Sequence, residues 1–140
     1  MTQALVADAS VAIGWVHPGQ ATPLSAALLE ALADGVTVEV PALWPLEVAN
    51  ALLVLTRRGK LSAGEKRAGL GWLRALPVRV DLDAAAIAWS TLSELAATHA
   101  QTVYDATYVE LAKRKKLPLA CADGPLRRGA QRAGVRLWVP

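Results

Sequence analysis

The chain of 140 residues has the length of one domain, and a hydrophobic content of 54% with a mean hydropathy of +0.30 excludes an intrinsically disordered protein. The net charge of +3 is a mild basic excess, and a single cysteine, Cys121, excludes an intramolecular disulfide. No run of about 18 apolar residues occurs, and no basic segment precedes the first apolar run, so neither a membrane span nor a signal peptide is expected. We expect one domain over residues 1–140, in the cytoplasm.

Strands and helices are expected to alternate along the chain. Apolar and β-branched runs predict five strands, at Ala4–Ala7, Val36–Val40, Val78–Leu82, Leu117–Ala122 and Val135–Val139. Between them, periodic apolar residues predict helical segments at about 11–16, 24–33, 45–58, 63–76, 84–99, 103–116 and 125–134. Such alternation predicts an α/β fold with a largely parallel sheet.

Capping signals support several of these helices. Ser62 and Glu65 have the spacing of a capping box, and Gly59 suits the end of the preceding helix. Asp83 and Thr102 are each placed to cap the helix that follows. These signals fix the expected helix boundaries.

Four acidic residues stand in apolar surroundings. Asp8 follows the first strand and Asp123 the fourth, whereas Glu47 and Asp105 interrupt apolar helical segments. In open α/β sheets the functional crevice lies beyond the carboxyl ends of the strands, so Asp8 and Asp123 are expected to face each other.

Converging carboxylates repel one another unless a cation lies between them. Carboxylate oxygens suit Mg²⁺ or Mn²⁺ rather than Zn²⁺, and such ions serve phosphodiester cleavage. Each acid alone also has an ordinary role. Asp8 suits a cap and Asp123 a turn, whereas Glu47 suits an exposed position early in a helix and Asp105 a helix N-terminus, both favoured by the dipole. Spacing alone leaves both interpretations open.

The segments VADASVAIGW, PALWPLEVANALL, TVYDATYVELAKRKKLPLACAD and GVRLWV resemble the PIN-domain nucleases, and specifically the VapC-type toxins of bacterial and archaeal toxin–antitoxin pairs. The resemblance covers nearly the whole chain. It implies a single PIN domain with a five-stranded parallel sheet of order 3-2-1-4-5 flanked by helices. It also implies Mg²⁺- or Mn²⁺-dependent RNA cleavage, with one or two ions held by Asp8, Glu47, Asp105 and Asp123.

The resemblance also assigns supporting residues. Ser10 matches a hydroxyl two residues after the first acid, Asn50 matches a polar residue near the site, and Thr102 lies beside the third acid. Cys121 stands where the family commonly has threonine or serine, and a thiol is a weaker hydrogen-bond donor. The family's last acid, here Asp123, is often its least essential one.

Basic residues gather near the C-terminus, where eight cations in the last 28 residues face one acid. This segment suits either a nucleic-acid contact or solvated helix ends. The candidates for holding an RNA backbone are Arg57, Arg58, Lys60, Arg127 and Arg128.

The expected function is therefore an endoribonuclease toxin that cleaves tRNA or another structured RNA and blocks translation. The family implies that a VapB-type antitoxin holds it inactive, and the apolar composition agrees with a homodimer. The alternatives are a Mg²⁺-dependent phosphatase with Asp8 as nucleophile and a catalytically silent module that binds nucleic acid or the antitoxin.

Overall fold

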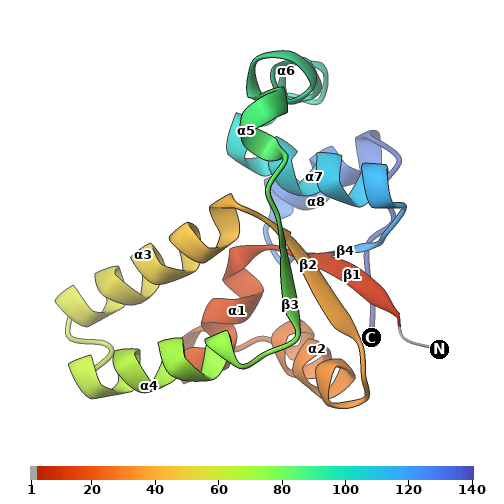
Figure 1. Cartoon of the computed structure of the whole chain (residues 1–140). Coiled ribbons are helices and arrows are strands. Elements are labelled where there is room, and N and C mark those ends of the chain that lie inside the picture. Colours follow the sequence, from red (N-terminus) through yellow and green to blue (C-terminus); the bar gives the residue numbers. More distant parts are fainter. Residues whose placement is uncertain (1–2) are drawn as a thin grey trace.

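A parallel sheet forms the centre of the molecule. The structure, a computed structural model, describes residues 3–140. Four parallel strands lie in the order β3-β2-β1-β4 (Figure 1). Their bounds are β1 (Ala4–Ala7), β2 (Thr37–Pro41), β3 (Val78–Asp81) and β4 (Leu119–Ala120). The predicted α/β fold with a parallel sheet is confirmed.

The predicted fifth strand is wrong for the described residues, so the sheet has the order 3-2-1-4 instead of the predicted 3-2-1-4-5. The C-terminal segment makes a single parallel bridge, Leu137 to Leu119, and β4 has two residues rather than six. The backbone groups that would extend this ladder are already bonded elsewhere. The N–H of Leu117 donates to Ala112, and the carbonyl of Cys121 accepts from the Arg127 side chain.

The helices agree closely with the predicted positions. The helical segments are α1 (Ala9–Val16), the 3₁₀ turn η1 (Pro18–Gln20), α2 (Pro23–Ala33), α3 (Leu43–Arg57), α4 (Ala63–Arg74), α5 (Ala84–Ile87), the π-helical turn η2 (Ala88–Leu92), α6 (Ser93–Thr98), α7 (Val103–Lys115) and α8 (Gly124–Arg132). None of the helices within residues 3–140 is long and apolar enough to cross a membrane.

Two of the three predicted caps are confirmed. Ser62 and Glu65 form a reciprocal capping box on α4, and the Thr102 hydroxyl accepts from the N–H of Asp105 at 3.0 Å. The predicted cap by Asp83 is wrong, because its backbone is already helical and its side chain makes no capping bond. Instead, its carboxylate lies 3.4 Å from Arg114. The single helix predicted at 84–99 is interrupted by η2.

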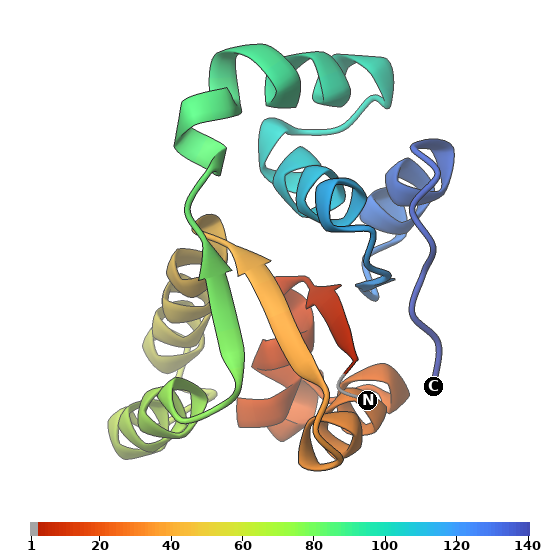
Figure 2. The ribbon, with the colours of Figure 1, turned by 45° about the vertical axis from the view of Figure 1, so that its right-hand side comes forward.

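The sheet is covered on both faces. Leu5, Val6 and Ala7 of β1 are at most 1% exposed, which explains why this central strand is an uninterrupted apolar run. Helix α7 packs on β1 and β2, α1 packs against α2 and α3, and α3 and α4 form a two-helix arm on one side (Figure 1). In the turned view, α5 and α6 lie beyond α7, far from that arm (Figure 2).

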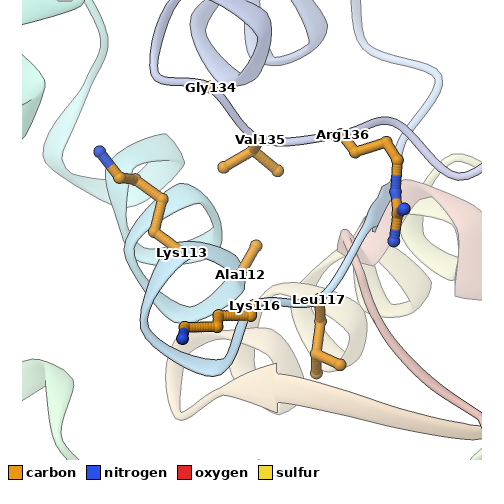
Figure 3. A pocket seen from close by; sticks show the side chains of 7 residues that line it. All are labelled: Ala112, Lys113, Lys116, Leu117, Gly134, Val135 and Arg136. Atoms are coloured by element: carbon orange, nitrogen blue, oxygen red, sulfur yellow. The ribbon is translucent and has the colours of Figure 1, made fainter.

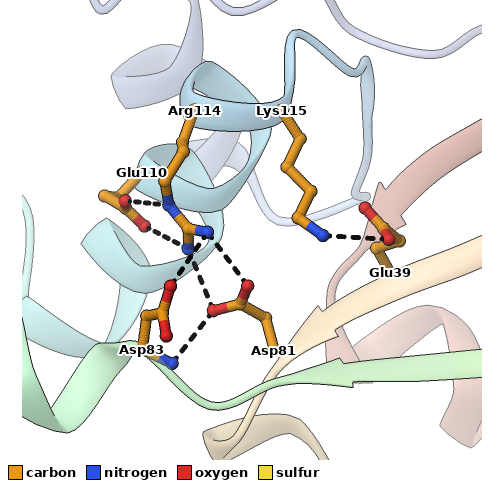
Figure 4. A network of polar contacts seen from close by, with 6 residues as sticks. All are labelled: Glu39, Asp81, Asp83, Glu110, Arg114 and Lys115. Carbon is orange, nitrogen blue, oxygen red and sulfur yellow. Dashed lines mark hydrogen bonds and ion pairs between the residues drawn. The ribbon is translucent and has the colours of Figure 1, made fainter.

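Ion pairs fasten α7 to the sheet edge. Arg114 binds Asp81 at 2.9 Å and Glu110 at 2.7 Å, and Lys115 binds the buried Glu39 of β2 at 3.1 Å (Figure 4). The Arg114 guanidinium holds the pKa of Asp81 below its ordinary value. These contacts set the position of α7 relative to β2 and β3.

Candidate functional site

One cavity collects the four predicted acids. It has a volume of about 630 Å³ and lies at the carboxyl ends of β1 and β4. Its polar lining comes from separate elements and comprises Asp8, Ser10, Glu47, Thr102, Tyr104, Asp105, Tyr108 and Asp123. Residues up to 115 positions apart in the sequence therefore share one site, which we call the acid cavity.

Asp8 is the most deeply placed of the acids. It is 6% exposed, at the junction where β1 ends and α1 begins. Burial raises its pKa to about 6, the Ser10 hydroxyl opposes this shift, and the nearby Asp123 and Glu47 add to it. The Ser10 hydroxyl lies 2.9 Å from both carboxylate oxygens. Asp8 stands at the N-cap of α1, where the N–H of Val11 also lowers its pKa although it is not placed for a well-formed capping bond.

Glu47 enters the cavity from α3, where a tyrosine contacts it. The Tyr108 hydroxyl of α7 donates a hydrogen bond to Glu47 Oε1. Burial, together with this bond, raises the pKa of Tyr108 above its ordinary value, so the phenol stays a donor. Sequence reasoning did not single out Tyr108. Its signal was its position three residues after Asp105, which places both on one helix face.

Asp105 lines the cavity from the first turn of α7, and Asp123 from the turn between β4 and α8. Burial raises the pKa of Asp105, and Asp123 and Glu47 raise it further. Asp123 has two roles, because its Oδ2 accepts from the N–H of Leu126 at 2.9 Å and caps α8 while the residue also lines the cavity. Asp123 is thus the cap of α8, where the sequence suggested an ordinary turn residue, and this role is compatible with a site.

The supporting residues divide into two groups. Ser10 and Thr102 line the cavity, but Asn50 is exposed and does not. The prediction for Asn50 fails because Ala51, one turn after Glu47, occupies the face toward the cavity. Cys121 is 1% exposed, and burial raises its pKa to about 12, so it is a neutral thiol.

The predicted RNA-binding cations lie outside the acid cavity. Arg57, Arg58 and Lys60 are exposed at the far end of α3, about 15 Å along the helix from Glu47. Arg127 donates to the Cys121 carbonyl at 3.1 Å, and Arg128 is exposed on α8. The lining of the acid cavity thus contains carboxylates but no lysine or arginine.

The donor set of the cavity suits a hard divalent cation. Within residues 3–140, no lysine or arginine pairs with any of the four acids. In the same part of the chain, no three Asp, Glu, His or Cys side chains lie close enough to hold a metal ion directly. Carboxylate oxygens around a roomy cavity fit Mg²⁺ or Mn²⁺, which retain several waters, better than a dehydrated four-coordinate Zn²⁺.

The comparisons with known proteins agree on the fold. No family model and no curated protein matches the sequence. Three solved structures match over most of their length. PAE2754 from Pyrobaculum aerophilum has a TM-score of 0.68 and 19% sequence identity, and the match covers 93% of this chain and 86% of that chain. VapBC2 from Rickettsia felis, bound to a DNA fragment from their promoter, has a TM-score of 0.66 and 9% sequence identity, and the match covers 97% of this chain and 98% of that chain. FitAcB from Neisseria gonorrhoeae has a TM-score of 0.63 and 21% sequence identity, and the match covers 96% of each chain.

The chain shares their fold. At identities of 9–21% the likeness concerns the backbone, a parallel sheet flanked by helices, and not individual site residues.

Proposed function

We propose that this protein is a metal-dependent endoribonuclease of the PIN-domain, VapC type. The observation that carries the proposal is the convergence of Asp8, Glu47, Asp105 and Asp123 on one cavity in which no cationic side chain of residues 3–140 pairs with them. Such a cavity repels RNA phosphates unless a cation intervenes. The fold shared with VapBC2 and FitAcB supports the same assignment.

The four acids would hold one or two Mg²⁺ or Mn²⁺ ions. Bound there, the metal supplies an activated water and neutralises charge on the scissile phosphate. The chain's own groups position these carboxylates. Ser10 donates to Asp8, and Tyr108 donates to one oxygen of Glu47 and leaves the other free. Thr102 fixes the first turn of α7 and, with it, Asp105.

Tyr104 extends the site toward the substrate. It lines the cavity and is 64% exposed, so its ring offers a face on which an unpaired RNA base can stack. Single-stranded loops of tRNA or another structured RNA present such bases. We therefore place RNA loops, rather than continuous duplex, as the substrate, with arrest of translation as the consequence of cleavage.

A VapB-type antitoxin partner and a homodimer complete the proposal. The Rickettsia felis structure holds VapBC2 on promoter DNA, and by likeness this chain would be one half of such a pair. Large apolar side chains at the surface support protein contacts, notably Trp89 at 99% and Leu82 at 75% exposure.

RNA cleavage by the purified protein tests the proposal. Activity is expected with Mg²⁺ or Mn²⁺, to be lost in EDTA, and to fall at least about 100-fold in Asp8→Asn and Asp105→Asn. Asp34→Asn is the matched control, because Asp34 is an exposed acid after α2 and does not line the cavity. Cleavage that survives both EDTA and the two cavity variants would overturn the assignment.

The alternatives find less support. A phosphatase with Asp8 as nucleophile would leave Glu47 and Asp105, which line the same cavity, without a role. A silent binding module gives the four acids no role at all, and their charge would oppose RNA binding.

A further inference from the structure

A second polar feature lies at the amino ends of β1 and β4, opposite the acid cavity. Two adjoining cavities of about 400 and 440 Å³ share Lys116, Leu117 and Arg136. They lie where the chain enters β4, next to the start of β1 on one side and the C-terminal segment on the other. The acid cavity lies at the other ends of these strands. We call this second feature the basic groove.

Three cations without acidic partners surround the basic groove. Lys113 and Lys116 stand on one side and Arg136 on the other, with the aliphatic side chains of Ala112 and Val135 between them (Figure 3). The groove lining contains no carboxylate, and none of the three cations makes an ion pair with any residue from Gln3 to Pro140. The groove therefore presents uncompensated positive charge.

The neighbouring cations of the same basic run are used differently. Arg114 is bound to acidic side chains of α7 and of the β3 edge, and Lys115 to Glu39 (Figure 4). The run Lys113–Lys116 is thus divided between a structural face toward β2 and β3 and an open face in the groove. Helical spacing places Lys113 and Lys116, three residues apart, on the same face.

The backbone of Lys116 ends helix α7 beside the groove. Lys116 has φ 56 and ψ 45, the left-handed conformation that strains any residue with a Cβ. After α2, α3 and α8 the chain places glycine at positive φ, at Gly35, Gly59 and Gly134. At Lys116 the left-handed residue ends α7, with the N–H groups of Lys116 and Leu117 donating to the carbonyls of Lys113 and Ala112, and this residue is a lysine that borders the groove.

The groove also holds an aromatic group and a fixed backbone. Trp138 lines its second half, and the N–H of Trp138 donates to the Leu119 carbonyl at 2.8 Å. The Arg136 carbonyl accepts from the N–H of Leu119 at 2.9 Å. Cations on both sides of an apolar floor, with an indole beside them, are the pattern of sites that bind single-stranded nucleic acid.

We propose that the basic groove binds the phosphate backbone of single-stranded RNA, with Lys113, Lys116 and Arg136 as phosphate contacts and Trp138 as a stacking surface. Helix α7 joins the two features, since Asp105 in its first turn and Lys116 at its end lie about 16 Å apart along the axis. That the bound strand belongs to the RNA that is cleaved rests on the proposed function. Binding by the groove does not.

Fluorescence anisotropy with a labelled single-stranded RNA of about 12 nucleotides, in EDTA to prevent cleavage, tests the binding. Lys113→Gln, Lys116→Gln and Arg136→Gln are each expected to weaken binding about 3- to 10-fold and to reduce the salt slope by about 0.7. Arg67→Gln is the matched control, because Arg67 is an exposed cation of α4 outside the groove, and its affinity is expected to stay within about twofold. Equal losses in all four variants, or none, would overturn the proposal.

A pair of glycine variants separates binding from folding. Lys116→Gly removes the charge and also the Cβ that strains the left-handed backbone. RNA binding is therefore expected to fall, while the thermal midpoint of unfolding stays the same or rises by up to about 3 °C. Within residues 3–140, Ala100 is the other non-glycine residue with positive φ. Ala100→Gly removes the same kind of backbone strain, and its RNA binding is expected to stay unchanged. Lys116→Gly binding RNA as tightly as the unaltered chain would contradict the assignment of Lys116.

Competition distinguishes the sources of phosphate. Inorganic phosphate and AMP at millimolar concentration are expected to displace the RNA only weakly, because the groove takes several backbone phosphates at once. Complete displacement by either would mean a small phosphate ligand instead, and tighter binding of a glutamate-rich peptide would mean an acidic protein partner. Either result overturns the RNA proposal without touching the acid cavity, whose own test is cleavage.

Discussion

Replacing Asp8 by asparagine is expected to stabilise the fold at neutral pH when no divalent ion is present. Asp8 is 6% exposed, and burial raises its pKa from 3.8 to about 6. One pKa unit corresponds to about 1.4 kcal/mol, so holding the ionised form in the folded chain costs about 3 kcal/mol. Asparagine has nearly the same shape, can accept the Ser10 hydrogen bond and carries no charge to desolvate.

The sign of the pH dependence follows from the raised pKa. Between about pH 4 and pH 6 the folded state binds the Asp8 proton more tightly than the unfolded chain, so the free energy of unfolding falls as the pH rises through this window. Asp8→Asn lacks this titration. The variant is therefore expected to match the unaltered protein at about pH 4 and to exceed its stability by up to about 3 kcal/mol at pH 8.

Urea unfolding followed by tryptophan fluorescence, at several pH values in EDTA, measures this difference. Asp34→Asn, an exposed acid outside the cavity, is the control and is expected to leave the stability within about 0.5 kcal/mol. Adding Mg²⁺ at pH 8 should then stabilise the unaltered protein, by about 2.7 kcal/mol at 100 times Kd, and Asp8→Asn much less. Asp8→Asn less stable than the unaltered protein at pH 8 without divalent ions would refute the reasoning.

Two further predictions concern packing and positioning. A Cβ at Gly69 of α4 would lie 2.5 Å from Val16 Cγ1, so Gly69→Ala is expected to cost about 1 to 3 kcal/mol in urea unfolding. Gly71 lies on the same helix, and a Cβ there would have no atom within 4 Å, so Gly71→Ala is expected to raise the free energy of unfolding by up to about 1 kcal/mol. A lower free energy of unfolding in Gly71→Ala would contradict the packing described for α4. Tyr108→Phe removes the hydrogen bond to Glu47 Oε1 and is expected to lower RNA cleavage and Mn²⁺ affinity about 10-fold each. Calorimetry measures the Mn²⁺ affinity. An unchanged Mn²⁺ affinity would show that Tyr108 does not position Glu47.

The sequence predicts those features of the fold that depend on nearby residues. The end of β1 before Asp8, the Ser62 capping box and the Thr102 cap each involve groups within three or four positions, and all were found as predicted. The fifth strand failed because its pairing depends on distant groups. The backbone sites beside Leu119 are occupied by α7 and by Arg127, which no local pattern of Val135–Val139 reveals.

The acid cavity shows the same division. The convergence of the four acids could be expected, because the ends of parallel strands meet at one edge. Tyr108 could not be distinguished from a core aromatic residue of an apolar helix, since only the fold brings it to Glu47, 61 positions away. Likewise, the separation of Arg114 from Lys113 depends on Asp81, which lies 33 positions from Arg114.

Helix α7 connects the two features with charges of opposite sign at its ends. Asp105 in the first turn and Lys113 in the last turn are each favoured by the helix dipole, by roughly 0.3 to 1 kcal/mol. The dipole therefore accounts for the signs of these charges without any ligand. The left-handed conformation of Lys116 ends α7, where the N–H groups of Lys116 and Leu117 donate to the carbonyls of Lys113 and Ala112. Arg136 lies on a different segment, so the dipole of α7 does not account for its charge beside the groove, whereas a shared anionic ligand does.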